Sequence, residues 1–385
     1  MNALTSLLKS DAGAGVILVV VAAIAMLLAN SPAAPFYSGA LSWSITMGWG
    51  ELALTKPLLK WINDGVMVLF FLVVGLEIKR ELVQGELSNR RRAALPVIGA
   101  AGGVLFPALI YTAINIGSPE TLRGWPVPTA TDIAFAVGIL ALVRRHIVPG
   151  LRIFLLGLAI IDDLAAIILI AILFTADLSP PAFGAAALCV AVLALLNHRG
   201  VTRLAPYLIL GFFLWIAVLK SGVHATLAGV ALGLLIPLRG KSSQDSPLLT
   251  LEHALAPWVT YGVMPLFALA NAGASFLGAG GSVLLDPVAI GIILGLFLGK
   301  QFGVFAFAWA AVRTGIASLP VGASWTGFYG VCILTGIGFT MSLFVGSLAF
   351  PPGTHDVAVK LGVLVGSTLS AIAGCAWIIA TRRRP

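Results

Sequence analysis

Two adjacent aspartates, Asp162 and Asp163, lie in the middle of an apolar run from Leu151 to Phe174. The run is long enough to cross a bilayer as a helix, which needs about 20 residues, so both carboxylates would lie near the midplane. A charged side chain there costs roughly 2.5–3.5 kcal/mol. Two other apolar runs contain Asp132 and Lys300. Four such groups without partners would cost on the order of 10 kcal/mol, so the sequence predicts a buried polar site that handles cations or protons.

The composition excludes an ordinary soluble domain. The 385 residues are 59% hydrophobic and 10% charged, with a mean hydropathy of +1.04, whereas a soluble surface needs far more charge. The net charge of +8 points to cytoplasmic loops that face anionic lipid, and we expect no nucleic-acid partner. The cysteines Cys189, Cys332 and Cys375 all lie in apolar segments and are expected to be core residues, not a disulfide framework or a metal site.

Apolar segments predict twelve spans, of which the first is expected to be retained and not cleaved as a signal peptide. The expected spans are 13–30, 60–78, 94–115, 121–143, 150–174, 181–197, 205–219, 223–237, 257–274, 287–311, 324–349 and 358–381. Lys and Arg are sparse in the odd-numbered connections and gather in the even-numbered connections and the termini, for example at Lys79-Arg80, Arg90–Arg92, Arg144-Arg145 and Arg382–Arg384. This bias predicts a multi-pass inner-membrane protein with both termini in the cytoplasm.

The connection at 31–59 carries a different pattern. Apolar and polar residues alternate from Leu41 to Met47, Gly48-Trp49-Gly50 follows, and a second short segment runs from Glu51 to Leu54. This pattern predicts a β-hairpin at about 40–55 on the outer face, although a loop lying on the membrane surface is the alternative. Because a lone two-stranded ribbon is marginal in water, we expect residues 41–54 to pair with a second copy of the chain. Residues 1–385 are otherwise expected to form a single transmembrane transporter domain.

Two of the expected spans are broken. The fourth carries Pro126 and Pro128 shortly before Asp132, and the eleventh carries Gly336 and Gly338 shortly before Thr340. The two spans are seven apart and therefore cross in opposite directions, which predicts inverted repeats formed by spans 3–5 and 10–12 with the site at their interface. A plain kink in each span is the alternative. The fold class is thus all-α membrane protein with broken crossing helices 4 and 11.

Unwound backbone at membrane depth must line a cavity or be buried in protein. It leaves half-helix ends with partial charges, where Asp132 is placed to offset the positive ends and Lys300 the negative ones. Asp162 and Asp163 point about 100° apart on a helix, so one can meet Lys300 while the other faces water. Carboxylate oxygens suit small hard cations. No His or Cys neighbours these acids, so the site is not expected to bind zinc.

The two acids and the lysine are expected to titrate as a coupled group. Such a site holds either a cation or protons, but poorly both at once, and that competition is what cation/proton exchange requires. A structural ion pair is the alternative, although such a pair would not need two adjacent acids.

A second charged cluster is expected outside this site. Its residues are Glu77, Lys79, Arg80 and Glu81 at the end of the second span, with Glu252 and His253 before the ninth. Charges at helix ends are commonly solvated, but a cluster at the mouth of a funnel could also sense pH, since His titrates in the useful range. Asp64 and His224, near the outer ends of their spans, are interpreted as structural.

Several segments, in order along the whole chain, resemble the NhaA family of bacterial sodium/proton antiporters. They are WINDGVMVLFFLVVGLEIKREL (61–82), PTATDIAFAVGILAL (128–142), FLLGLAIIDDLAAI (154–167), VLKSGVHATLAG (218–229), LEHALAPWV (251–259), PLFALANAG (265–273), GKQFGVF (299–305) and TGIGFTMSLF (335–344). Crossed broken helices are a known property of this family, so the repeat is not an independent finding.

The resemblance implies roles for particular residues. Asp163 is similar to the principal cation- and proton-binding carboxylate, and Asp162 to the neighbouring acid that pairs with Lys300. Thr131 and Asp132 match the broken fourth helix, and the backbone around Gly336, Gly338 and Thr340 the broken eleventh. Positions linked to activation at alkaline pH are matched by Glu77, Arg80, Glu81, Glu252 and His253. The family pattern has a second histidine where this chain has Ala256, so the activating pH is expected to differ.

The expected function is therefore secondary active transport and not enzymatic catalysis. The resemblance implies an electrogenic antiporter that moves Na⁺ or Li⁺ outward and more H⁺ inward, is regulated by pH, has no cofactor and forms homodimers through the hairpin. Asp162 and Asp163 are the expected ligands of the transported ion. One alternative is a cation-coupled solute symporter, for which the sequence shows few anchors. The other is an intramembrane aspartyl protease, whose GxGD motif this chain lacks.

Overall fold

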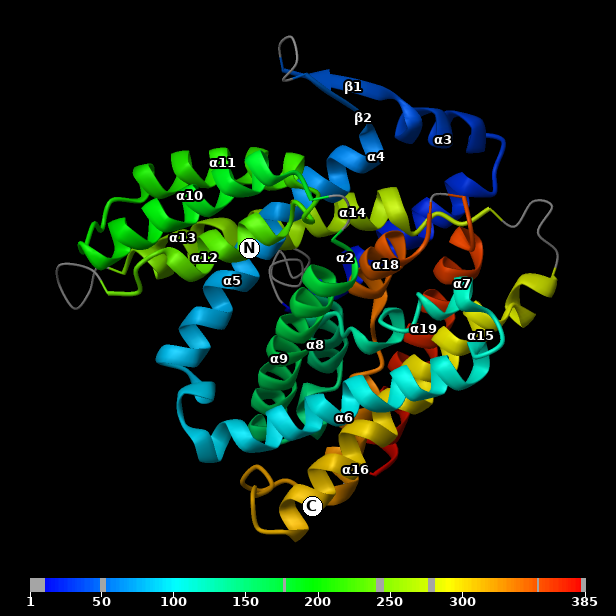
Figure 1. Ribbon diagram of the computed structural model, residues 1–385. Helices are drawn as coiled ribbons and strands as arrows, with labels where there is room; N and C mark the ends of the chain where they lie inside the picture. The colour runs from blue at the N-terminus through cyan, green and yellow to red at the C-terminus, as the bar shows by residue number, and fades with distance from the viewer. Residues whose placement is uncertain are drawn as a thin grey trace, which may run out of the picture. The chain divides into compact units, whose positions relative to one another are not determined.

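The computed structural model describes residues 11–48, 53–175, 178–239, 246–275, 281–351 and 353–381. Within these ranges nine helices are long and apolar enough to cross a membrane, and two further helix pairs pass the same test together. The expected all-α membrane class is confirmed (Figure 1). The arginines expected at 382–384 in the cytoplasm lie outside the described residues.

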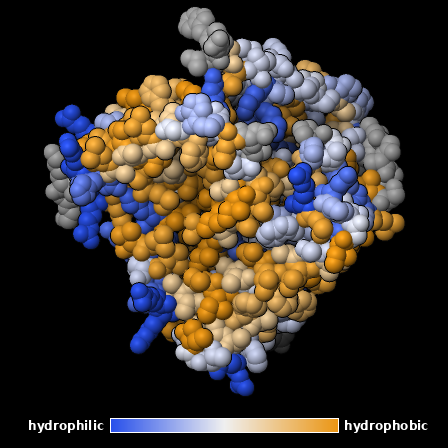
Figure 2. Space-filling model, viewed as in Figure 1, coloured by the Kyte–Doolittle hydropathy of each residue, from blue (hydrophilic) through white to orange (hydrophobic). Residues whose placement is uncertain are grey.

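Apolar side chains are also exposed in quantity, as a lipid-facing surface requires. Hydrophobic residues cover much of the face shown in Figure 2, and large exposed side chains include Leu188, Ile209, Phe212 and Phe213. In a soluble protein such continuous apolar surface would be an aggregation liability. On a membrane protein it contacts lipid tails.

The contacts divide the chain into two compact units. Unit 1 comprises the described parts of Met1–Pro32, Glu86–Ala166 and Asn271–Pro385, and unit 2 those of Ala33–Gly85 and Ile167–Ala270. The division falls within helix α9 (Pro149–Leu173), so its two aspartates belong to unit 1.

Unit 1 contains five long continuous spans, one of them only in part, beside two broken ones. Its elements are α2 (Asp11–Ala29), η3 (Glu86–Ser88), α6 (Arg90–Asn115), α7 (Pro119–Leu122), η4 (Val127–Thr129), α8 (Ile133–Leu142), η5 (Arg144–His146), most of α9, η7 (Gly281–Leu285), α15 (Pro287–Leu294), η8 (Gly295–Gly299), α16 (Lys300–Arg313), α17 (Trp325–Leu334), α18 (Phe339–Ala349) and α19 (Asp356–Ala380). Helices α6 and α16 lie side by side (Figure 1). They can approach closely because both contact positions are glycine. A Cβ on Gly102 would overlap the carbonyl oxygen of Gly303, and a Cβ on Gly303 would overlap that of Gly102.

The two expected breaks are confirmed in unit 1. The segment Pro119–Thr129 and helix α8 are bent by 47°, and α17 and α18 by 45°. Prolines end the first half of the broken span that contains α8. In the span formed by α17 and α18, Gly336 lets the break lie close to η8 and α19, because a Cβ there would overlap Leu296 O and Ser370 Oγ. A π-helical segment, η8, leads directly into Lys300, and such segments are frequent at functional sites.

Unit 2 contains continuous spans and the sheet. Its elements are α3 (Ala34–Ser42), β1 (Ser44–Met47), β2 (Leu54–Pro57), α4 (Leu58–Trp61), η2 (Ile62–Val66), α5 (Met67–Val83), the end of α9, α10 (Pro180–His198), α11 (Leu204–Ser221), α12 (Leu227–Leu235), α13 (Pro247–Trp258), η6 (Val259–Val263) and α14 (Met264–Asn271). Helix α12 packs along α5, and α10 along α11.

The β-hairpin is confirmed, but the predicted strand limits are wrong. Strands β1 and β2 are antiparallel, with Ser44 opposite Pro57 and Met47 opposite Leu54. Leu41 and Ser42 belong to α3, where the Ser42 hydroxyl donates to the carbonyl of Ser38 (2.8 Å), so the alternation begins inside a helix. The predicted turn residues 49–50, and Glu51 of the predicted second segment, lie outside the described residues.

The helix in the expected eighth span is shorter than predicted. Helix α12 covers nine residues within the expected range 223–237. Gly222 ends α11 in the left-handed conformation (φ 85°), and residues 223–226 form a turn, not helix. The Lys79 ammonium donates to the carbonyl of Ile236 (2.5 Å), just beyond the end of α12.

Candidate functional site

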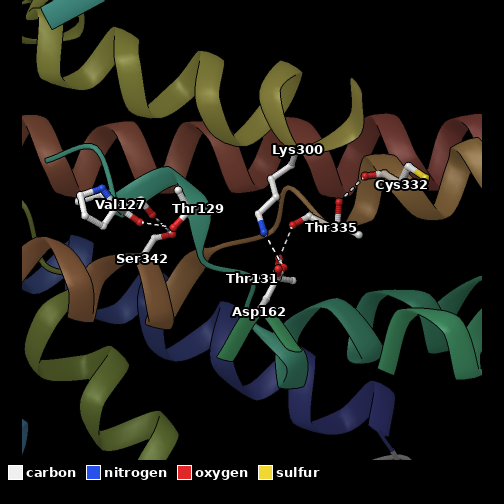
Figure 3. A network of polar contacts seen from close by, with 9 residues as sticks. Val127, Thr129, Thr131, Asp162, Lys300, Cys332, Thr335 and Ser342 are labelled. Atoms are coloured by element: carbon white, nitrogen blue, oxygen red, sulfur yellow. Dashed lines mark hydrogen bonds and ion pairs between the residues drawn. The ribbon is translucent and has the colours of Figure 1, made fainter. Parts of the chain in front are cut away.

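A buried ion pair joins α9 to α16 in unit 1. The Nζ of Lys300 lies 2.5 Å from Oδ2 of Asp162, and neither side chain is exposed to solvent. The hydroxyl of Thr131, in the break before α8, donates to the same oxygen at 2.8 Å (Figure 3). Lys300 thus pairs with Asp162, as the family resemblance implied. Both donors contact Oδ2 and leave Oδ1 of Asp162 without either of them.

The hydroxyl of Thr131 also lies 2.8 Å from the carbonyl oxygen of Thr335, which Figure 3 shows at the end of α17. A hydroxyl has one proton, so Thr131 can donate to Asp162 or to Thr335, but not to both at once. The Thr131 hydroxyl thus lies between Asp162 and the second broken span, and the charge of Asp162 favours one orientation of its proton.

Asp132 lies where the two second halves of the broken spans begin. Its Oδ1 accepts from Phe135 N–H in the first turn of α8 (2.9 Å), and its Oδ2 accepts from the N–H of Thr340 in α18 (3.0 Å) and from the Thr340 hydroxyl. The N–H of Asp132 donates to the carbonyl of Ile337 (2.7 Å). The carboxylate therefore faces the positive ends of two half-helices, the position expected from the helix dipoles.

The buried charges of unit 1 do not balance. Asp132, Asp162 and Asp163 are each 1% exposed and Lys300 is fully buried, so three carboxylates accompany one ammonium and carry a formal charge of −2 when all are ionised. In addition, Oδ1 of Asp162 has no hydrogen-bond partner among the residues that the structure describes. Uncompensated charge is costly in a dry interior. Protons or a bound cation must supply the missing positive charge.

The second expected cluster forms in unit 2. Nη1 of Arg80 lies 2.9 Å from Glu81, and its Nε lies 3.1 Å from Glu252 on α13. Glu77 faces the same three charges. His253 is exposed on α13, so the structure brings together the acids and Arg80 but leaves the histidine at the surface.

Asp64 and His224 form a separate contact in unit 2. Lys56 of β2 pairs with Asp64 (2.7 Å), and Nε2 of His224 lies 3.8 Å from the same carboxyl group. The indole of Trp215 donates to the carbonyl of Asp64 (2.9 Å). These contacts fasten the hairpin to η2 and link η2 to α11, in agreement with their structural interpretation.

Sequence reasoning missed one residue beside the broken eleventh span. Ser367 on α19 is 3% exposed and accepts hydrogen bonds from two backbone N–H groups at the start of α18. The available signal was weak: Ser367 and Ser370 are three residues apart in an apolar helix and so share one face.

Comparisons with known proteins agree over the whole chain. The model of the family described as "Na+/H+ antiporter 1" matches residues 5–378. A protein of Rhodospirillum rubrum named "Na(+)/H(+) antiporter NhaA" is 54% identical over 394 residues, covering 100% of this chain and 99% of that protein. A Pseudomonas fluorescens protein of the same name is 52% identical, covering 99% of this chain and 97% of that protein.

The fold is also similar to a solved structure. The sodium proton antiporter MjNhaP1 from Methanocaldococcus jannaschii matches with a TM-score of 0.55, covering 96% of this chain and 92% of that one. Its sequence is 13% identical, so this likeness concerns the fold alone.

Proposed function

Because the chain belongs to the Na⁺/H⁺ antiporter 1 family, we propose that Na⁺ and H⁺ compete for Asp163 and Asp162 in unit 1. The protein is a Na⁺/H⁺ antiporter, which is a secondary transporter and not an enzyme, and this sets aside both the symporter and the peptidase alternatives. The observation that carries the site assignment is the unbalanced charge: three dry carboxylates accompany one ammonium. A site with this formal charge of −2 becomes neutral only when it gains two positive charges, as two protons or as one proton and one Na⁺.

The contacts suggest a division of labour within the site. Asp132 is engaged by three donors from α8 and α18, so its role is to offset the helix dipoles. Asp162 is held by Lys300 and Thr131 through one oxygen and offers the other to a cation. Asp163, the next residue on α9 and equally buried, is the principal carboxylate for exchange.

Exchange then proceeds by alternating access. When the site faces the cytoplasm, protons leave it and Na⁺ binds to the ionised carboxylates. When it faces outward, protons displace Na⁺, and the inward proton gradient supplies the energy. The formal charge of −2 lets more than one proton replace one Na⁺, which supports electrogenic exchange. Li⁺, another small hard cation, is proposed as a second substrate.

We further propose that Glu77, Arg80, Glu81 and Glu252 adjust activity to pH, together with the exposed His253. The backbone at Gly336 and Gly338 keeps the crossing compact. The chain is proposed to dimerise through the hairpin, to lie in the inner membrane with both termini in the cytoplasm, and to work as one transporter domain built from its two units.

The decisive variant is Asp163→Asn. In vesicles with an imposed pH gradient, Na⁺ dissipates the gradient through the wild-type protein, and we expect this signal to vanish in the variant. Glu86→Gln is a matched control, because Glu86 pairs with Arg92 at an exposed position (3.4 Å) and its loss leaves exchange intact. Near wild-type exchange by Asp163→Asn would overturn the site assignment.

A further inference from the structure

The first N–H groups of α18 are capped by two different side chains in unit 1. Gly338 N–H and Phe339 N–H both donate to Oγ of Ser367 on α19, at 3.2 and 3.1 Å. The next N–H, of Thr340, donates to Asp132 at 3.0 Å. All of these side chains are buried, so no water takes over the bonds when one acceptor is removed.

Helix α18 in turn sets the geometry of the neighbouring break. Its Thr340 holds the carboxylate of Asp132 through both backbone and hydroxyl, and the hydroxyl of Ser342 donates to the carbonyl of Val127 at 2.8 Å (Figure 3). A small rotation at the start of α18 would therefore move groups in both broken spans. Such rotation becomes favourable when buried N–H groups lose their acceptor and must find another.

We propose that Ser367 is a positioning residue for the cation/proton site, an inference that rests on the proposed exchange function. By accepting two N–H bonds, it leaves Asp132 to the donors of Thr340 and Phe135. Without it, the amides of Gly338 and Phe339 need another acceptor, and the Asp132 carboxylate already accepts from the next amide of the same turn, that of Thr340. Additional donors at that carboxylate make the local potential more positive, and a more positive site binds Na⁺ less tightly.

The chain offers a matched control one turn further along α19. Ser370 is fully buried, shares a face with Ser367, and its Oγ has no hydrogen-bond partner among the described residues. Ser370→Ala thus removes the same atom from the same dry surface without uncapping a helix. A loss of general packing affects both variants alike, whereas a loss of positioning affects Ser367→Ala alone.

The test is the Na⁺ dependence of exchange in proteoliposomes. We expect Ser367→Ala to raise the apparent KM for Na⁺ roughly 5- to 10-fold, with a maximal rate within about twofold of wild type, and Ser367→Thr to restore the KM. Ser367→Cys, which keeps a weak acceptor of similar size and preserves folding, is expected to give an intermediate KM. Ser370→Ala is expected to behave as wild type.

The inference is overturned if Ser367→Ala and Ser367→Cys both keep the wild-type KM, or if Ser370→Ala raises the KM as much as Ser367→Ala. Asp163→Asn, assayed in parallel, separates this inference from the function. Persistent exchange in Asp163→Asn counts against the proposed site itself, whereas its loss with an unchanged KM in the Ser367 variants counts against the positioning role alone.

Discussion

The two units carry charge clusters of the same composition in different surroundings. Unit 1 groups Asp132, Asp162 and Asp163 with Lys300, and unit 2 groups Glu77, Glu81 and Glu252 with Arg80. Each therefore has three carboxylates and one neighbouring cationic side chain. In unit 1 all four side chains are dry, whereas the Arg80 side chain of unit 2 is 34% exposed and that of Glu81 15%.

The backbone differs as much as the burial. The site of unit 1 lies where two spans are broken and bent, so half-helix ends and a shared hydroxyl surround the carboxylates. The cluster of unit 2 lies on the unbroken helices α5 and α13. The comparison teaches that composition alone does not make a transport site. Water can solvate the surplus charge of unit 2, but the surplus in unit 1 must be met by a proton or a transported cation.

The largest expected difference concerns stability. Lys300→Ala leaves the Asp162 carboxylate buried without its ammonium partner, which costs about 3–5 kcal/mol for a buried pair. Arg80→Ala is expected to cost less, because the Arg80 side chain is 34% exposed and water can reach it. Unfolding of both purified variants in detergent measures the contrast. Equal losses would show that the two clusters do not differ in burial as described.

The next effect concerns the shared hydroxyl. Thr131→Val is close to isosteric and removes the donor between Asp162 and the Thr335 carbonyl. We expect the apparent KM for Na⁺ to rise about 10-fold, in line with the loss of one buried charge-assisted bond, and Thr131→Ser to retain wild-type behaviour. The KM for Na⁺ is measured at a pH where exchange is fully active. A wild-type KM in Thr131→Val would show that this residue takes no part in Na⁺ binding.

A smaller effect is expected in unit 2. Glu252→Gln removes a negative charge that faces Glu77 and Arg80, so the remaining acids hold their protons less tightly. The pH profile of exchange should move to lower pH by roughly 0.5–1 unit with little change in maximal rate. Glu86→Gln, at an exposed position outside this cluster, is the control and should leave the profile unchanged. A drop in maximal rate without a shift would place Glu252 in the transport step itself.

The smallest effect is expected at the hairpin. Lys56→Met breaks the ion pair with Asp64, a partly exposed contact worth about 0–1 kcal/mol. Exchange kinetics should match wild type, and cross-linking should show the same dimer fraction, because the strand pairing of the hairpin is unaffected. A large loss of exchange would show that this contact is part of transport, contrary to its structural interpretation.

The sequence was most informative where charge interrupts apolar runs. Asp162, Lys300 and the breaks before Asp132 and Thr340 could be predicted because charged groups, prolines and glycines are rare inside spans and need a reason. Ser367 could not, because a serine in an apolar helix commonly bonds to its own backbone, and its partners lie 28 and 29 residues away. Tertiary contacts alone reveal such a role.

The errors have the same origin. The alternation of period two at Leu41 and Ser42 is too short to separate strand from helix, and the apolar stretch at 223–237 did not show that residues 223–226 form a turn and leave α12 with nine residues. Local pattern predicts the type of an element better than its limits, which packing decides.

The central claim is that a dry group of acids must hold either Na⁺ or protons. Its most direct test is to titrate unbuffered, purified protein with Na⁺ at alkaline pH while proton release is recorded. We expect Na⁺ binding to release protons in wild type, with Asp163→Asn releasing none. Na⁺ that binds to wild type without releasing protons, or equal release from both proteins, would contradict the account.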